Sequence, residues 1–290
     1  MQNKTIVGWN ASEASEEALR WAVERERSRD GVISVVFVVD DKDGGVPAGE
    51  VARQLTEARA ALRDTEARVR ESAPRCSVTS TAVEGATLDA LLEFANHDWV
   101  LAVGTTQRGS RKARSGQSVG ARLASAAQGP VAVIPGGRPS AGVGIVAAID
   151  GTVAASLAAR LAASEAHRFG EALTLVHAWS EPVLMEGQPL DAQFTEALEQ
   201  ESDQLLAHAR AELVDEFPEV SVDIRSVRGQ TATTLVELSH SAREIVLGSR
   251  GLRGLRRILL GSVSREVVVR AECPTIVVGR VPHPATPAAR

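Results

Sequence analysis

The chain contains an internal repeat, and this repeat constrains its fold more than any other feature of the sequence. The segment TIVGWNASEASEEALRWAV corresponds to IVAAIDGTVAASLAARLAA, so that Asn10 matches Asp150 at an offset of 140 residues. Beyond the second strand of each copy the offset becomes 144, and Gly104 matches Gly248. An insertion of four residues near positions 180–200 of the second copy accounts for the change. A chain of 290 residues is also long for one core, so we expect two similar domains in tandem.

Each copy alternates strand patterns with helix patterns. In the second copy the apolar runs GIVAAID, ALTLVHAW and EIVLG have the length of buried strands, and the stretches between them have helical spacing. This alternation requires right-handed crossovers and a mostly parallel sheet covered on both faces. We therefore predict an α/β protein with two doubly wound five-stranded domains, at residues 1–138 and 139–281. The boundary lies within the linker-like PGGRPSAG, and residues 282–290 form a tail.

Composition and charge exclude several classes of protein. The net charge of −5 makes the chain a poor general binder of nucleic acid, because such binding depends on neutralising phosphates. No apolar run reaches the roughly 18 residues of a membrane helix, so no membrane association is predicted. The N-terminus has no signal-peptide pattern, and Cys76 and Cys273 have no metal-like spacing. These features favour a reducing, cytoplasmic location and two cysteines buried as small apolar residues.

A glycine-rich stretch near the end of the second copy indicates where a ligand binds. In doubly wound sheets the ligand lies beyond the carboxyl ends of the strands, and LGSRGLRGLRRILLGSVS follows such a strand. The stretch matches neither a P-loop nor a dinucleotide fingerprint. Gly248 and Gly251 allow the backbone to lie against a flat ring or a sugar. Gly261 precedes a helix whose first amides favour an anion.

On these residues the chain resembles the universal stress protein family. The resemblance rests on the spacing Gly248-x2-Gly251-x9-Gly261-Ser262, the AIDGT turn that holds Asp150, the strand VHAW and the closing CPTIVVG. The duplication is similar to that of the tandem two-domain members of actinobacterial type. The resemblance implies a fold like that of the adenine nucleotide alpha hydrolases and a bound adenine nucleotide: ATP, or else ADP or AMP. Magnesium would accompany a triphosphate, and no metal site built from protein ligands is evident.

The resemblance assigns the nucleotide contacts to the second copy. The backbone of Ala178 takes the position that recognises the adenine edge, and Asp150 takes the position beside the ribose. The glycines and the helix start take the positions next to the sugar and the phosphates. The complete predicted site consists of Ala148, Asp150, Ala178, Leu247, Gly248, Arg250, Gly251, Gly261, Ser262, Val263 and Ser264.

The first copy departs from this pattern, and we expect its site to be weak or empty. Asn10 replaces the aspartate, and Gln107 and Gln117 replace two of the glycines. If both glycines need positive φ, the two glutamines cost about 2 kcal/mol together, or roughly thirtyfold in affinity. The residues of this second, weaker site are Asn10, Val38, Gly104, Ser118 and Val119.

Several of these residues also have a purely structural interpretation. Asp150 can be a turn or helix-cap residue, and Trp179 can either stack on a base or shield a loop. His177 lies in an apolar strand and is interpreted as a core histidine with satisfied hydrogen bonds. Of the loop arginines, only Arg250 is expected to contact nucleotide. The remaining tryptophans, Trp9, Trp21 and Trp99, are interpreted as core residues.

The sequence favours a nucleotide-binding stress-response protein over an enzyme. No general base is placed to activate water at a γ-phosphate, so no catalytic residue is assigned and weak ATP hydrolysis at most is expected. Two alternatives remain: a slow ATPase or other nucleotide-cleaving enzyme of the related α/β superfamily, and a structural stress factor that binds no nucleotide. The family resemblance also implies that GPVAVIPG and CPTIVVG pair across the copies in an internal pseudo-dimer. Dimerisation of two chains and an unidentified regulatory protein partner follow from the same resemblance.

Overall fold

The computed structural model describes residues 4–40, 47–105, 118–137, 142–180, 192–249 and 260–279. The first repeat consists of β1 (Lys4–Gly8), α1 (Glu13–Arg27), β2 (Val32–Val39), α2 (Ala48–Ser72), β3 (Ser77–Glu84), α3 (Thr87–Leu92), β4 (Val100–Thr105), α5 (Val119–Ala126) and β5 (Val131–Pro135). The second consists of β6 (Ile145–Ala148), α6 (Val153–Phe169), β7 (Leu173–Trp179), α7 (Ala192–Glu216), β8 (Val222–Arg228), α8 (Thr231–Leu238), β9 (Glu244–Gly248), α9 (Ser262–Arg270) and β10 (Thr275–Val278). The predicted boundary after residue 138 and the predicted tail lie outside the described residues.

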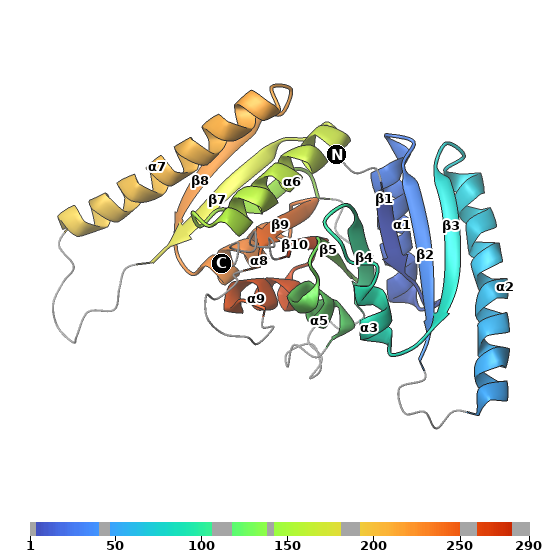
Figure 1. The fold of residues 1–290 in the computed structure, drawn as a ribbon. Helices are drawn as coiled ribbons and strands as arrows, with labels where there is room; N and C mark the ends of the chain where they lie inside the picture. The colour runs from blue at the N-terminus through green and yellow to red at the C-terminus, as the bar shows by residue number, and fades with distance from the viewer. Residues whose placement is uncertain are drawn as a thin grey trace, which may run out of the picture.

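The strands of both repeats form one continuous sheet in the order β3-β2-β1-β4-β5-β10-β9-β6-β7-β8 (Figure 1). Strands within each repeat pair in parallel, and the two repeats meet where β10 runs antiparallel to β5, with Thr275 opposite Val133 and Val277 opposite Val131. This arrangement confirms the predicted doubly wound α/β class and the internal pseudo-dimer. The pairing also covers two strand edges that separate domains would expose.

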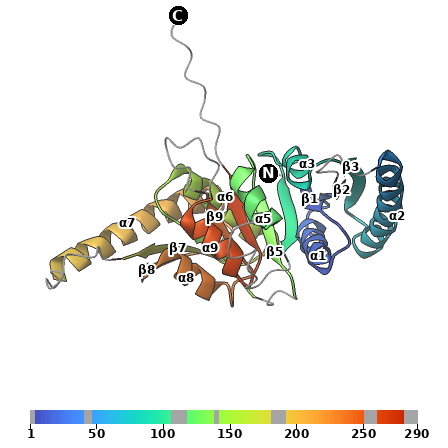
Figure 2. The same cartoon turned by 90° about the horizontal axis from the view of Figure 1, so that it is seen from below.

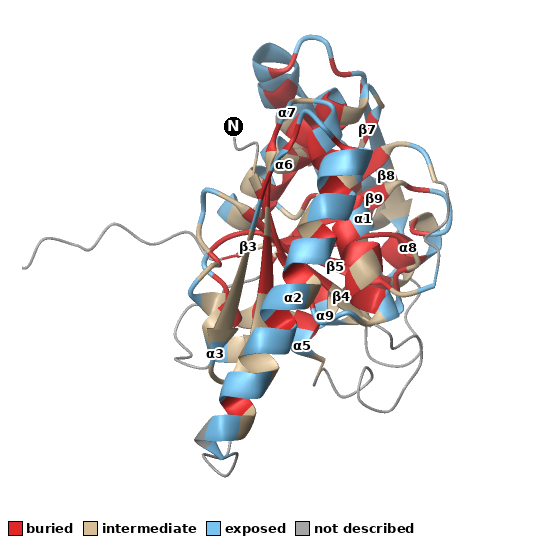
Figure 3. Cartoon of the chain, turned by 90° about the vertical axis from the view of Figure 1, so that its right-hand side faces the viewer, coloured by how far each residue is buried: buried red, intermediate tan, exposed pale blue. Residues whose placement is uncertain are grey.

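Helices cover both faces of the sheet, as buried parallel strands require (Figure 2). Helices α1, α2, α6 and α7 pack on one face, whereas α3, α5, α8 and α9 pack on the other. Figure 3 shows that α2 is exposed on its outer side and that the edge strand β3 beside it is mostly only partly buried. Cys76 and Cys273 are buried, as predicted, and so are Trp9 and Trp21. Trp99 is only partly buried, with the Lys4 ammonium 3.8 Å from its ring centroid.

Local sequence signals fix several helix ends. Ser12, Ser118 and Thr152 cap α1, α5 and α6, because each side-chain oxygen accepts a hydrogen bond from the amide three residues later. Gly170 ends α6 in the left-handed region at φ 65°, as its position after the apolar pattern predicts. None of the helices within the described ranges is both long enough and apolar enough to span a bilayer.

Candidate functional site

A cavity lies at the carboxyl ends of β6, β7 and β9, against the start of α9. Its lining consists of Ala148, Ile149, Asp150, Ala155, His177, Ala178, Thr231, Leu247, Gly248, Gly261, Ser262, Val263 and Ser264. Nine of these are among the eleven nucleotide-binding residues predicted for the second copy. The other two, Arg250 and Gly251, lie outside the described residues. Segments separated by more than a hundred positions in the sequence therefore meet at one edge of the sheet, where doubly wound proteins bind ligands.

Asp150 is held by the turn that joins β6 to α6. Its Oδ1 accepts hydrogen bonds from the Thr152 amide at 3.0 Å and the Thr152 hydroxyl at 2.6 Å. The Thr152 Oγ1 in turn accepts from the Ala155 amide at 3.2 Å and so caps α6. Gly151, at φ 73°, supplies the left-handed residue that this turn needs. The turn interpretation of Asp150 is thus correct, and it also fixes the carboxylate beside the cavity.

The N-terminus of α9 presents backbone donors to the cavity. Gly261 occupies the N-cap position and supplies no side-chain hydrogen bond to the first turn. Helix N-termini leave their first amides without intrahelical partners and carry a partial positive charge, so an anion is favoured beside Ser262 and Val263. The buried Ser264 hydroxyl donates to the Gly248 carbonyl at 3.2 Å. The hydroxyl hydrogen of Ser264 is therefore bonded within the protein, although Ser264 belongs to the predicted nucleotide site.

Gly248 has a structural role that the sequence did not reveal. A Cβ at this position would lie 2.7–2.9 Å from the backbone carbonyl and side chain of Ala154 in α6. The equivalent Gly104 approaches Ala14 in α1 even more closely, with 1.8 Å between an ideal Cβ and the Ala14 carbonyl oxygen. The glycine shared by the two repeats is therefore required by strand–helix packing, whether or not a ligand lies beside it.

The interpretation of His177 as a satisfied core residue is wrong. The side chain is only partly buried and lines the cavity. Its Nδ1 is buried without a hydrogen-bond partner among the described residues. Burial lowers the pKa of His177, whereas the charges of Asp150 and Glu201 act in the opposite direction. The imidazole is therefore mainly neutral at pH 7.

Three further cavity residues, Ile149, Ala155 and Thr231, were also missed, although Thr231 follows the third strand of its repeat at the expected edge. Its hydroxyl donates to the Ala178 carbonyl at 3.4 Å. The Nε1 of Trp179 donates to the Ser226 Oγ at 3.0 Å, and Trp179 is not part of the described cavity lining. Among the residues whose positions are described, no three His, Cys, Asp or Glu side chains gather as a metal site requires.

The first repeat forms a different arrangement at the equivalent edge. The exposed Asn10 replaces the carboxylate, and its Oδ1 accepts from the amide and hydroxyl of Ser12 at 3.2 and 2.6 Å. Ser118 Oγ accepts from the Ala121 amide at 3.2 Å, so α5 is capped by its own serine. Of the other residues predicted for this site, Val38 lies on β2 and Gly104 lies on β4. Val119 is the exposed first residue of α5.

One physical reason given for a weak first site is wrong. Gly261 has φ −56°, a region open to any residue, so glutamine at the matching position, Gln117, has no left-handed strain to overcome. Gly251 and both glutamines lie outside the described residues, so the other half of the argument stays a prediction. Within the described residues, the first repeat differs from the second in two ways at this edge. Asn10 replaces the carboxylate of Asp150, and the Ser118 side chain caps α5.

Comparison with known proteins identifies the family. The model of the universal stress protein family matches residues 1–135 and again residues 144–279. The chain belongs to the universal stress protein family. A universal stress protein of Mycobacterium tuberculosis is 31% identical over 95% of this chain and 97% of its own length. Another from the same organism is 29% identical, over 94% of this chain and 95% of its own length.

Solved universal stress protein structures share the fold. A universal stress protein from Archaeoglobus fulgidus aligns with a TM-score of 0.69 at 18% identity, covering 96% of this chain and 97% of that one. Two shorter members align with about half of this chain, at TM-scores of 0.39 and 0.35. The first was solved in complex with cAMP, and the second, from Archaeoglobus fulgidus, in complex with dAMP.

Proposed function

We propose that this universal stress protein binds ATP, or a related adenine nucleotide, in the second-repeat cavity and uses occupancy of that site as a signal in a stress response. The observation that carries the proposal is the convergence of nine predicted contact residues on one cavity that also contains an uncapped helix N-terminus. The helix amides favour phosphate, and a carboxylate beside a sugar can accept hydrogen bonds from its hydroxyls. Both groups belong to the second repeat, Asp150 in the turn between β6 and α6 and the amides at the start of α9.

Each part of the cavity has a separate role in this proposal. The backbone of Ala178 binds the edge of the adenine, Asp150 binds the ribose, and the first amides of α9 bind phosphate. Magnesium would enter with a triphosphate and supply charge neutralisation between its oxygens. The proposal assigns binding and no catalytic step. Formation of dimers by two chains and a regulatory protein partner remain predictions.

The role of Asp150 is tested by calorimetric titration of the full chain with ATP. Asp150→Ala is expected to weaken binding by about tenfold to a hundredfold, because a hydrogen bond to a charged group is lost. Asn10→Ala, the same position in the first repeat, is expected to change affinity by less than about twofold. Thr152→Ala keeps the carboxylate and removes the α6 cap, so it controls for disturbance of the turn.

Three results would contradict the proposal. No heat of binding and no ATP-induced rise in the unfolding temperature would favour a structural factor without nucleotide. Loss of affinity in Asn10→Ala alone would move the site to the first repeat. ATP hydrolysis well above that of a buffer control would favour the enzyme alternative.

A further inference from the structure

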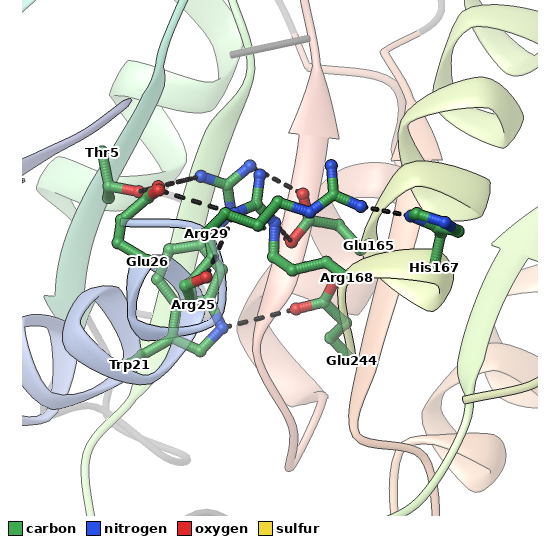
Figure 4. A network of polar contacts seen from close by, with 9 residues as sticks. All are labelled: Thr5, Trp21, Arg25, Glu26, Arg29, Glu165, His167, Arg168 and Glu244. Carbon is green, nitrogen blue, oxygen red and sulfur yellow. Dashed lines mark hydrogen bonds and ion pairs between the residues drawn. The ribbon is translucent and has the colours of Figure 1, made fainter. Parts of the chain in front are cut away.

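A buried ion pair joins the two repeats through α1 and α6 (Figure 4). The Nε of Arg25 donates to Glu165 Oε2 at 3.0 Å, and Nη2 donates to Glu165 Oε1 at 2.6 Å. The two side chains are 2% and 0% exposed. This bidentate geometry is the strongest form that an arginine–carboxylate pair takes, and here it is fully removed from water.

Further charged residues surround this pair. We refer to Arg25, Glu26, Glu165, Arg168 and Glu244 together as the inter-domain charge cluster. Arg25 also binds Glu26, and its Nη1 donates to the Thr5 hydroxyl at 3.0 Å. Arg168 Nη1 donates to the Arg25 carbonyl at 3.1 Å and lies 3.5 Å from Glu26 Oε2. Figure 4 shows these side chains converging from elements of both repeats.

Arg25 and Glu165 occupy the same position in the two repeats, since 25 plus the offset of 140 is 165. In a twofold pairing of identical domains, a residue on the symmetry axis meets its own copy. Two first domains paired in this way would place Arg25 against Arg25, and two second domains would place Glu165 against Glu165. Opposite charges meet only when a first domain pairs with a second domain.

The residues around Arg25 and Glu165 are also specific to the pairing of a first domain with a second domain. Residues that match in the alignment of the repeats differ in chemistry at each of these positions: Thr5 and Ile145, Trp21 and Leu161, Glu26 and Ala166, Ser28 and Arg168, Val100 and Glu244. By contrast, β5 and β10 are both short apolar strands, VAVIP and TIVV, that pair through their backbones. Such strands do not distinguish one domain from the other, so we expect discrimination from the buried side chains of the charge cluster, most of which lie on α1 and α6.

We propose that the Arg25–Glu165 pair determines which partner the inter-domain surface accepts. The α1 surface of the first domain accepts the α6 surface of a second domain and rejects another copy of itself. The second domain of the same chain is the favoured partner, because the covalent link raises its effective concentration. Buried ion pairs often contribute little net stability, because desolvation offsets their attraction. Specification of a partner is a role that they can fill without such a contribution.

Charge reversal in the full chain reproduces the contacts that two first domains, or two second domains, would make with each other. Glu165→Arg creates the arginine–arginine encounter of two first domains, and Arg25→Glu creates the glutamate–glutamate encounter of two second domains. The double variant Arg25→Glu/Glu165→Arg restores opposite charges. Correct pairing is reported by Arg29→Cys/His167→Cys, because these two side chains meet at the exposed border of the interface. A short bismaleimide then links them within one chain, which intact mass spectrometry distinguishes from a link between chains.

Each single reversal is expected to slow the intrachain crosslink by about tenfold or more and to lower the unfolding temperature by about 10 °C. The double reversal is expected to crosslink within about threefold of the parent and to regain at least about half of the temperature loss. Arg53→Glu, on the exposed surface of α2, changes the net charge by the same amount as Arg25→Glu and is expected to leave both measurements unchanged. A chain without the introduced cysteines controls for reaction of the two natural ones.

The proposal is overturned if a single reversal crosslinks as fast as the parent, or if the double reversal is no better than the single ones. Should the single reversals fail to fold, Arg25→Met/Glu165→Met decides the question, because it removes both charges without bringing like charges together. This variant is expected to fold and to crosslink within about threefold of the parent. Its failure would show that the pair holds the domains together and does not select the partner.

Discussion

Gly104→Ala is expected to lower the free energy of unfolding by more than about 3 kcal/mol, a larger loss than most single substitutions cause. An ideal Cβ at this position lies 1.8 Å from the Ala14 carbonyl oxygen and 2.2 Å from its carbon. Both sides of this contact are backbone, one in β4 and the other in α1, so neither can move without displacing an element of the core. Urea unfolding followed by far-UV circular dichroism measures the loss.

Gly49→Ala is the matched control for this substitution. Gly49 lies in α2, is exposed, and has no atom within 4 Å of an ideal Cβ. Alanine there is expected to leave stability unchanged or to raise it by up to about 1 kcal/mol, because alanine favours helix. Equal midpoints for the two variants would show that β4 and α1 do not approach each other as closely as described.

Glu244→Gln is expected to become steadily more stable relative to the parent chain as the pH rises from 5 to 8. Glu244 is completely buried, and burial raises its pKa to about 8, with Glu165 acting in the same direction. Arg25, Arg243 and the hydrogen bond from Trp21 Nε1, at 3.4 Å, act in the opposite direction. Oε1 has no hydrogen-bond partner among the described residues. The carboxyl group is thus held protonated at neutral pH inside the inter-domain charge cluster.

The direction of this pH dependence follows from proton linkage. Between the unfolded pKa of about 4.5 and the native value of about 8, the folded chain keeps a proton that the unfolded chain has lost. The free energy of unfolding therefore falls with rising pH across this window, by up to about 1.4 kcal/mol per pH unit. Glutamine keeps the shape and removes the proton equilibrium. Urea unfolding at several pH values measures the difference in free energy of unfolding between Glu244→Gln and the parent chain. Glu57→Gln, at an exposed position, is the control. Parallel pH profiles of Glu244→Gln and the parent would contradict the assignment.

Much of the fold was predictable because the repeat reveals the same pattern twice. Strand length, alternation with helices and matching offsets predicted the parallel sheet, and the family resemblance implied the β5–β10 junction. The positions at the start of α9 were assigned from the family resemblance, whereas the sheet itself indicated the residues that follow its strands. The carboxyl ends of parallel strands must share one edge, so residues following separate strands come together there.

The features that were not predictable depend on contacts between distant segments. Arg25 and Glu165 lie in helices whose charged residues resemble a solvent-exposed face, and no sequence pattern shows that another helix covers them. His177 lies in a continuous apolar strand, where side-chain alternation gives no clue to which residue faces a cavity. Gly248 was attributed to ligand contact because the close approach of Ala154 comes from a separate helix.

The central claim, that the α9 N-terminus binds the phosphates of a nucleotide, is tested most directly by ATP titration of Ser262→Pro. Ser262 is the first residue of α9, where proline is tolerated, so the substitution removes one backbone donor and preserves the helix. Val119→Pro makes the same change at the first residue of α5, and Ser262→Ala keeps the amide. We predict that Ser262→Pro weakens ATP binding by about tenfold or more, whereas the two controls stay within about twofold of the parent. Equal affinity of Ser262→Pro and the parent chain, or an equal loss in Val119→Pro, would contradict the account.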